Sequence, residues 1–294
     1  MMRNMPRLFA SARPGALPLP ADRRLQAFTP ASVLDKYGDS AAGVRAVAKG
    51  DNVITMFDSI GEDYWSGGGV TAKKVQSQLR AIGDRAIEVH INSYGGDMFE
   101  GIAIYNVLRE HPQDITVKVM GMAASAASII AMAGDNVEIG AASFLMIHNC
   151  WVIAMGNRHD MAETAAWLEP FDQAMADVYA ARSGADSAQI VQWMDAETYM
   201  SGSTAVERGF ADALLPADAV TVDEEAKASD RDVNELRAME LALVASGMTR
   251  TQARARIRNL KGTPGAAPDN AVTPGADAPQ LNEALTGLLA NLTR

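Results

Sequence analysis

The sequence predicts an α/β fold for most of its 294 residues. Short apolar runs typical of buried strands alternate along the chain with longer segments whose apolar residues recur three and four positions apart. Glycines and small residues stand where several of these strands end, as tight connections into helices require. Strands that alternate with helices indicate an α/β architecture. With 48% hydrophobic residues, the chain has enough apolar material for one large domain with appendages, or for two domains.

The elements of this core follow in order along the chain. The expected strands are the short apolar runs Val53–Phe57, Ala86–Asn92, Ile115–Met120, Asn136–Ile139, Phe144–His148 and Ala213–Leu215. The expected helices run from the cap Thr71 to Ile82, from the end of Ser93–Asp97 to Arg109, and over Asp160–Arg182, Ser187–Met194 and Thr204–Arg208. Pro170 predicts a bend within the longest of them.

The two ends of the chain differ from the core. Residues 1–50 are rich in Pro, Ala and Arg and show no periodicity, which predicts a partly disordered arm. Residues 51–220 form the expected core domain, and residues 221–294 a helical tail with one helix over Asn234–Leu260 and a short one over Leu281–Leu292. Residues 262–279 between these helices are a Pro/Gly/Ala linker that contains two copies of TPGA.

Composition excludes several classes of function. The net charge of −10 argues against bulk nucleic-acid binding, and no apolar run reaches the roughly 18 to 20 residues that span a bilayer. The arginines near the N-terminus are not followed by the apolar segment of a secretory signal. The single cysteine, Cys150, allows no internal disulfide and fits a reducing compartment. No His, Cys or acidic pair has a familiar ligand spacing, so we expect no metal. From the composition as a whole we expect a cytoplasmic protein without cofactor, membrane or nucleic-acid partner.

The segment Gly121–Gly134, GMAASAASIIAMAG, carries the first candidate for chemistry. It follows an apolar strand and passes through a glycine into a helix of small residues, and the free N–H groups at a helix N-terminus favour negative charge. Small neighbours let another backbone approach Ser125 closely, so we hypothesise that Ser125 is a nucleophile. The structural alternative is a serine that only bonds the preceding turn of a tightly packed helix.

Ser93–Asp97, SYGGD, is the second candidate. It connects a strand to a helix through two glycines, which lets backbone N–H groups point into a cleft. The segment is either a plain tight turn or an oxyanion hole. It lacks the third glycine of a dinucleotide-binding fingerprint.

A serine nucleophile needs a general base, usually a histidine oriented by a carboxylate. His148 is the best candidate because it stands at a strand end shortly after the Ser125 helix. The other three histidines read as structural or exposed, and they are His90, His111 and His159. Asp195 and Glu197 both precede a turn, and the residues alone do not choose between them as the acid. Cys150 lies too close to His148 along one strand for attack by a thiol, and it reads as a small buried hydrophobe.

Together these segments resemble the ClpP family of serine peptidases, and more narrowly its phage and prophage members, the head maturation proteases. The matching segments occur in the family's order, and they are INSYGGD from Ile91, GIAIYN from Gly101, GMAAS from Gly121, MAGD from Met132, LMIHN from Leu145 and AVERGFAD from Ala205. The resemblance covers roughly Val53 to Pro216, which is about one domain. Several ordered motifs are far more specific than any one of them.

The resemblance implies a spiral of ββα units with two stacked sheets. It places Ser125 at the nucleophile position and His148 at the base position, with the N–H groups of Gly96 and Ala126 as the oxyanion hole. Counting back from YMSGSTAVERG puts Glu197 where the family has an aspartate, and Asp195 is the second choice. The longer glutamate is a departure from the family pattern.

The resemblance also implies a homo-oligomeric ring, stacked through the helix Asp160–Arg182, around a chamber that admits unfolded chains. Any ATPase partner would be a separate chain, and the phage relatives act on capsid proteins without one. We therefore expect an ATP-independent serine endopeptidase that cleaves capsid or scaffold proteins during head maturation, in the host cytoplasm or in proheads. One alternative is a ring-forming assembly protein without activity. The other, a crotonase-type acyl-CoA enzyme, is disfavoured by the Ser/His pair.

Overall fold

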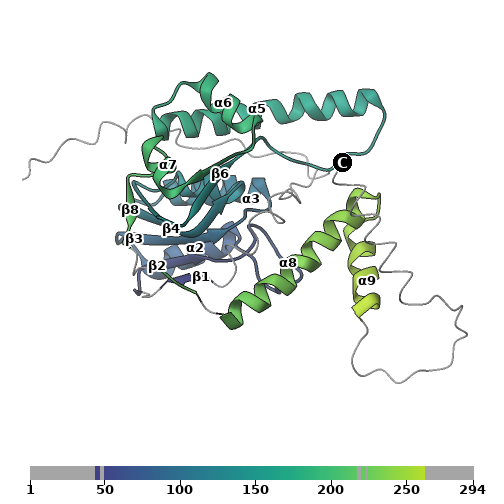
Figure 1. Ribbon diagram of the computed structural model, residues 1–294, viewed down its shortest axis with the longest axis horizontal. Helices are drawn as coiled ribbons and strands as arrows, with labels where there is room; N and C mark the ends of the chain where they lie inside the picture. Colours follow the sequence, from purple (N-terminus) through teal and green to yellow (C-terminus); the bar gives the residue numbers. More distant parts are fainter. Residues whose placement is uncertain (1–43, 47–49, 217–219, 223, 262–294) are drawn as a thin grey trace, which may run out of the picture. The chain divides into compact units, whose positions relative to one another are not determined.

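Parallel strands joined by helices organise the part of the chain that the structure, a computed structural model, describes: residues 44–46, 50–216, 220–222 and 224–261 (Figure 1). The predicted α/β class is confirmed. The contacts divide the chain into one unit up to Glu235 and a second from Leu236. Most of the expected arm, the linker 262–279 and the helix Leu281–Leu292 lie outside the described residues.

The main sheet has a parallel path and a side branch. Its path is β2 (Val53–Met56), β3 (Ile87–Ser93), β4 (Ile115–Ala124), β5 (Asn136–Gly140) and β8 (Ala213–Leu215). The first half of β4 pairs with β5, and its last residues pair with β6 (Phe144–Ile147). Strand β6 in turn pairs antiparallel with β7 (Thr198–Ser201). This branch matters for the site, because it brings the ends of β4 and β6 together.

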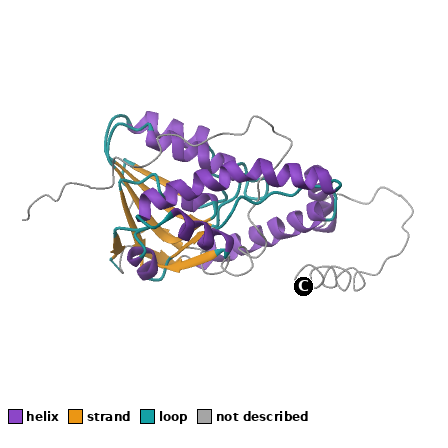
Figure 2. Cartoon of the chain, turned by 90° about the horizontal axis from the view of Figure 1, so that it is seen from above, coloured by secondary structure: helices purple, strands orange, loops and turns teal. Residues whose placement is uncertain are grey.

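Helices connect the strands and lie beside the sheet (Figure 2). In chain order they are α2 (Ala72–Ile82), α3 (Met98–Arg109), α4 (Ala126–Ala131), α5 (Arg158–Ser183), α6 (Ser187–Asp195) and α7 (Gly202–Glu207). Thr71 caps α2 as predicted, since its side chain accepts from the Lys74 N–H at 3.3 Å. Pro170 lies inside α5, where it leaves one backbone carbonyl without its helical donor.

Two parts of the secondary structure differ from the prediction. The strand β7 was not expected, because its four residues, Thr198–Ser201, have too little apolar pattern to read as a strand without the partner β6. The expected tail helix is two helices, α8 (Glu224–Ala245) and α9 (Arg250–Lys261). Gly247, with φ 99°, breaks the helix, and Thr249 and Gln252 form a reciprocal cap at the start of α9. The short ribbon of β1 (Val44–Ala46) and β9 (Val220–Val222) was also not expected.

The apolar core lies between the sheet and its helices. Alternate residues of the central strands, such as Val117, Val119 and Ile139, are fully buried in it. Gly101 of α3 allows the start of α4 to come very close, because a Cβ there would meet the Cβ of Ala126 at 2.9 Å. Small residues at this crossing therefore set the position of the β4–α4 turn.

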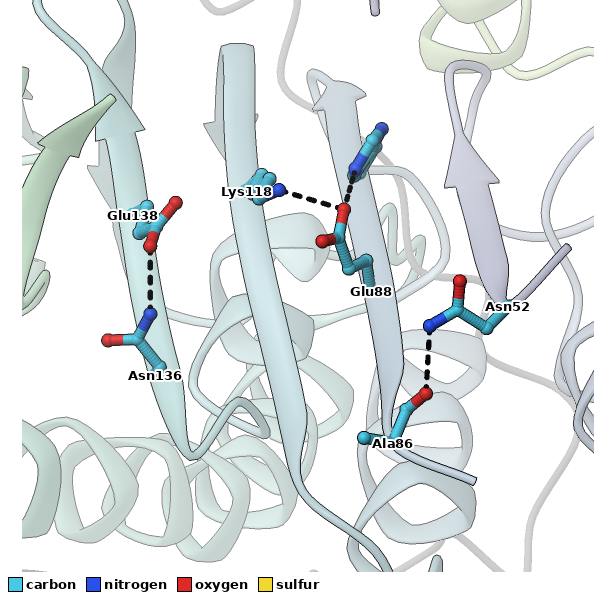
Figure 3. A network of polar contacts seen from close by, with 7 residues as sticks. Asn52, Ala86, Glu88, Lys118, Asn136 and Glu138 are labelled. Carbon is cyan, nitrogen blue, oxygen red and sulfur yellow. Dashed lines mark hydrogen bonds and ion pairs between the residues drawn. The ribbon is translucent and has the colours of Figure 1, made fainter. Parts of the chain in front are cut away.

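The opposite face of the central strands carries a network of polar contacts (Figure 3). Lys118 of β4 and His90 of β3 both contact the carboxylate of Glu88, at 2.8 and 2.9 Å. Burial raises the pKa of Glu88, but the hydrogen bonds and charges of Lys118 and His90 outweigh it and hold this pKa below its ordinary value. His90 is thus a wall residue in an ion-paired network, as its place within a strand predicted.

The second unit is described by itself. Leu241 of α8 is buried together with Ala253 and Ile257 of α9. Arg254 reaches both carboxylate oxygens of the buried Glu240, at 3.0 and 3.1 Å. None of the described helices combines the length and apolar character that crossing a bilayer requires.

Candidate active site

Ser125 stands alone between β4 and α4. Its backbone has φ 56° and ψ −126°, which is unusual for a residue other than glycine and costs about 1–3 kcal/mol. Its N–H donates to the Met146 carbonyl at 3.0 Å, and its side chain does not cap α4. The hydroxyl is therefore held at a sharp strand-to-helix turn and remains available for another partner.

That partner is His148, directly after β6. The pairing of Ala124 with Met146 places the end of β6 beside the end of β4. The Nε2 atom of His148 lies 2.6 Å from the Oγ atom of Ser125, and both residues are buried. Within the described chain this is the only side-chain hydrogen bond of His148. With the ring proton on Nδ1, Nε2 accepts from the serine hydroxyl, which is the arrangement needed for proton removal.

Burial sets the charge of this histidine. It lowers the pKa of His148 from its ordinary value of 6.5 to about 4, because the imidazolium form loses hydration. The imidazole is therefore neutral near pH 7, and the neutral form is the one that acts as a base.

The SYGGD turn lies directly against Ser125. A Cβ on Gly95 would stand 2.6 Å from the Ala124 carbonyl oxygen and 2.7 Å from the Cβ of Ser125. Gly95 and Gly96 both have positive φ, 93° and 151°, so the turn depends on glycine in conformation as well as in space. The two glycines thus bring a backbone segment to within contact distance of the serine.

The backbone N–H groups of Gly96 and Ala126 lie at this junction, and their hydrogen bonding differs from that of their neighbours. The Gly95 N–H donates to Ser93 Oγ at 3.1 Å, and the Asp97 N–H donates to the Ile60 carbonyl at 2.8 Å. The Gly96 N–H between them takes no part in these bonds. Ala126 is the first residue of α4, so its N–H has no acceptor within the helix. An oxyanion beside Ser125 Oγ would require such donors, so the N–H groups of Gly96 and Ala126 stay the predicted pair.

The two candidate acids have different surroundings. The β6–β7 pairing ends at Ile147 and Thr198, so His148 and Glu197 are the next residues beyond the end of this ladder. Glu197 itself has φ 46° and an exposed side chain. Asp195 accepts instead from the side chain of Asn149 at 2.7 Å. Neither carboxylate bonds His148, so the structure brings the predicted nucleophile and base together but not the predicted acid.

Ser128, the other serine of the small-residue segment, has a structural role. Its hydroxyl donates to the Ser125 carbonyl at 2.6 Å and also contacts the Tyr179 hydroxyl at 2.8 Å. All of these groups lie in the core between α4 and α5, and Ser128 is 0% exposed. Ser128 therefore fixes the first turn of α4, and its hydroxyl is occupied by these two contacts.

The buried contact between Ser128 and Tyr179 predicts that removing one hydroxyl destabilises the protein more than removing the other. Ser128→Ala leaves the Tyr179 hydroxyl without its partner in the core, and we expect it to cost about 1–3 kcal/mol of unfolding free energy. Tyr179→Phe leaves Ser128 bonded to the Ser125 carbonyl and should cost about 1 kcal/mol. Denaturant unfolding of both variants checks the order, and a larger loss for Tyr179→Phe would contradict it.

The other residues considered as candidates, His111, His159 and Cys150, do not contact Ser125 or His148 through a side-chain hydrogen bond in the described part of the chain. His111 bonds the Arg85 carbonyl at 2.8 Å rather than the end of its own helix, and His159 lies exposed in α5. Cys150 is buried, and burial, with a further contribution from Asp172, raises the pKa of its thiol well above the ordinary value. In the described ranges, no group of three His, Cys, Asp or Glu side chains is arranged to hold a metal ion.

Sequence reasoning did not single out Asp172. It lies in the middle of α5, and its Oδ1 atom accepts from the Cys150 N–H at 2.6 Å. The spacing of 22 positions between the two residues gives no local pattern to detect. Only the packing of α5 beside the end of β6 reveals the contact.

Known proteins are similar to the central part of this chain. A family model described as Clp protease matches residues 69–218. An ATP-dependent Clp protease proteolytic subunit of Ligilactobacillus salivarius is 31% identical over 184 residues, 60% of this chain and 90% of the relative. One of Bacteroides fragilis is 29% identical over 171 residues, covering 56% and 79%, and proteolytic subunit 1 of Prochlorococcus marinus is 29% identical over 158 residues, covering 52% and 81%. The matched family segment contains Ser125 and His148 and ends before α8 and α9.

Proposed function

Because the chain belongs to the Clp protease family, we propose that it is a serine endopeptidase whose nucleophile is Ser125 and whose general base is His148. The observation that carries this proposal is the 2.6 Å contact between His148 Nε2 and Ser125 Oγ. A neutral imidazole at that distance from a buried, uncapped serine hydroxyl is the pair that acyl transfer requires.

The geometry suggests the following reaction. Ser125 Oγ attacks the carbonyl carbon of the scissile peptide while Nε2 of His148 takes the hydroxyl proton. The carbonyl oxygen becomes an oxyanion, which the N–H groups of Gly96 and Ala126 stabilise. The C–N bond then breaks, the leaving amine takes the proton from His148, and the acyl group remains on Ser125. Water, deprotonated by His148, then attacks the ester carbonyl, the C–O bond to Ser125 breaks, Oγ takes the proton back from His148, and the acyl group leaves as a carboxylic acid.

Glu197 is our proposed third member of this set, with Asp195 as the alternative. The support for Glu197 is its place at the end of the β6–β7 ladder, directly before Thr198, which pairs with Ile147, together with its strained φ of 46°. A strained, exposed residue beside the base is one that a small backbone change can turn toward Nδ1 of His148. Asp195 is already bonded to Asn149, which favours Glu197.

The pH dependence of acylation tests this assignment. His148 as it stands has a pKa of about 4, and a carboxylate on Nδ1 favours the imidazolium and raises that value, by about 1–3 units for a close opposite charge. Protonated His148 is no base, so the rate of labelling by a fluorophosphonate falls as the pH falls through this pKa. We expect the midpoint of Glu197→Gln to lie near 4 and that of the wild type to lie about 1–3 units higher.

Asp195→Asn is the matched control, and its midpoint should equal that of the wild type. Equal midpoints in the wild type and Glu197→Gln would contradict the role of Glu197. A lowered midpoint in Asp195→Asn alone would assign the acid to Asp195.

We also propose that the protein works as a homo-oligomeric ring. The first half of α5 and the loop before it expose apolar side chains, with Met155 75% and Met161 38% exposed. Large exposed apolar side chains along a projecting helix are suited to contact with another copy of the chain. This is the helix that the resemblance assigns to ring stacking.

For the substrate, we propose unfolded segments of capsid or scaffold proteins, cleaved without an ATPase in the cytoplasm of a bacterial host or within proheads. The support is the resemblance to head maturation proteases and the α8–α9 tail, which lies beyond the family match. The relatives are described as ATP-dependent, so the proposed independence from ATP can be tested directly. The assembled protein should cleave an unfolded protein at the same rate with and without ATP and a ring ATPase. Cleavage that requires both would overturn ATP independence but leave the peptidase assignment intact.

One observation favours a second function. His148 has no carboxylate partner in the described chain, and a pair without its acid suits an assembly protein that keeps the ring but has lost activity. A fluorophosphonate would label such a protein neither at Ser125 nor elsewhere. Ser125→Ala would leave every processing event unchanged.

A further inference from the structure

The three residues that follow β6 have to be held outside the β6–β7 ladder. His148, Asn149 and Cys150 come directly after the last residue of β6 and belong to no strand. Backbone groups that leave a ladder need other partners when they are buried. Cys150 is 8% exposed, so its N–H is such a group.

Two carboxylates from different helices hold this segment. Asp172 of α5 accepts from the Cys150 N–H at 2.6 Å, and Asp195 at the end of α6 accepts from the Asn149 side chain at 2.7 Å. The Asn149–Asp195 pair is exposed, whereas Asp172 is partly buried. A short bond from a buried N–H to a carboxylate is the stronger kind of anchor.

The surroundings of Asp172 show that its carboxylate is not a solvated surface group. Burial raises its pKa, the bonds from Cys150 oppose this rise, and the nearby charge of Asp195 adds to it. Asp177, a turn and a half further along α5, is exposed and bonds only the side chain of Gln173, at 2.8 Å. The same helix therefore offers a solvated aspartate for comparison.

The anchor acts two residues from the imidazole. His148 makes no side-chain hydrogen bond in the described chain other than that to Ser125, so its ring direction depends on how the backbone on either side is fixed. The β6 ladder fixes the preceding side, and Asp172 fixes the following side. We propose that Asp172 is a positioning residue, which holds the Cys150 N–H so that His148 Nε2 stays within reach of Ser125 Oγ. This inference rests on the proposed peptidase function.

Three variants of the full chain test the proposal, with a fluorogenic peptide for turnover and a fluorophosphonate for acylation. Asp172→Ala should lower kcat and the labelling rate by about 10- to 100-fold and change KM by less than about 2-fold, because a displaced base affects the chemical step. Asp172→Asn keeps an oxygen that accepts from the Cys150 N–H and should recover to within about 5-fold of the wild type. Asp177→Ala should match the wild type.

A further variant covers the case in which Asp172→Ala does not fold. Asp172→Glu keeps the charge but moves the oxygen by one methylene, and its kcat should also fall by about 10-fold, with unchanged thermal unfolding and oligomeric state. Wild-type kcat in Asp172→Ala or Asp172→Glu would overturn the proposal, as would equal losses in Asp172→Asn and Asp172→Ala. If the wild type itself neither labels at Ser125 nor cleaves the peptide, the proposed function fails rather than this inference.

Discussion

Ser125→Ala is expected to lower kcat/KM for peptide cleavage by about 10⁴-fold or more, without changing the fold. The loss is this large because the serine forms the covalent intermediate, and the remaining groups then provide only binding and oxyanion stabilisation. Alanine adopts the local φ of 56° no less readily than serine, and the Ser125 side chain makes no capping bond to α4. Steady-state cleavage of a fluorogenic peptide measures the loss.

The double variant Ser125→Ala/His148→Ala checks that the two residues act as a unit. Groups that act together are strongly non-additive, so this variant should be about as slow as Ser125→Ala alone. A further loss of similar size in the double variant would show that His148 acts independently of Ser125. Unchanged cleavage in Ser125→Ala would remove the nucleophile assignment.

Gly95→Ala is expected to lower kcat/KM by at least about 10²-fold, the typical effect of losing one oxyanion-hole donor. The new Cβ would stand 2.6 Å from the Ala124 carbonyl and 2.7 Å from the Cβ of Ser125. Both neighbours belong to the rigid β4–α4 turn, so the SYGGD turn has to move away and takes the Gly96 N–H with it. The effect should appear in kcat and in the rate of fluorophosphonate labelling.

Gly83→Ala is the matched control for backbone strain. Gly83 also has a positive φ, 75°, but a Cβ there meets nothing within 4 Å. We expect this variant to lose about 1–3 kcal/mol of stability and to keep its kcat/KM. If Gly83→Ala and Gly95→Ala lose activity equally, the loss comes from strain and not from displacement of the turn beside Ser125.

Local patterns were enough to predict that Ser125 and His148 lie close together. Ser125 follows a strand that runs through a glycine into small residues, and His148 ends an apolar run, so each could be placed at the end of a strand. The ends of parallel strands lie at one edge of a sheet, which made their meeting a reasonable expectation. The pairing of β4 with β6 produces the contact between them.

Local patterns did not choose between the two candidate acids, because their positions depend on the strand β7. This strand has little apolar pattern of its own and exists by pairing with β6. Its pairing with β6 ends at Ile147 and Thr198, so Glu197, rather than Asp195, is the residue directly before the paired part of β7. Asp172 is further still from prediction, since the 22 positions to its partner Cys150 are bridged only by helix packing.

The tail shows a different limit of sequence reasoning. The apolar spacing over Asn234–Leu260 is nearly continuous, and it predicted one helix where the structure has α8 and α9. The break depends on Gly247 and on the Thr249 cap, and the bond between Arg254 and Glu240 joins the two helices. A glycine followed by a capping residue within a long helical pattern predicts a break between two helices.

The most direct test of the peptidase assignment is to label the assembled wild-type protein with a fluorophosphonate and to locate the adduct by peptide mass spectrometry. The reagent forms a P–O bond to an activated serine and releases fluoride, so it reports the nucleophile and does not depend on knowing the substrate. We predict an adduct on Ser125 that is absent from Ser125→Ala. An adduct on Ser128, or none on the assembled protein, would contradict the account.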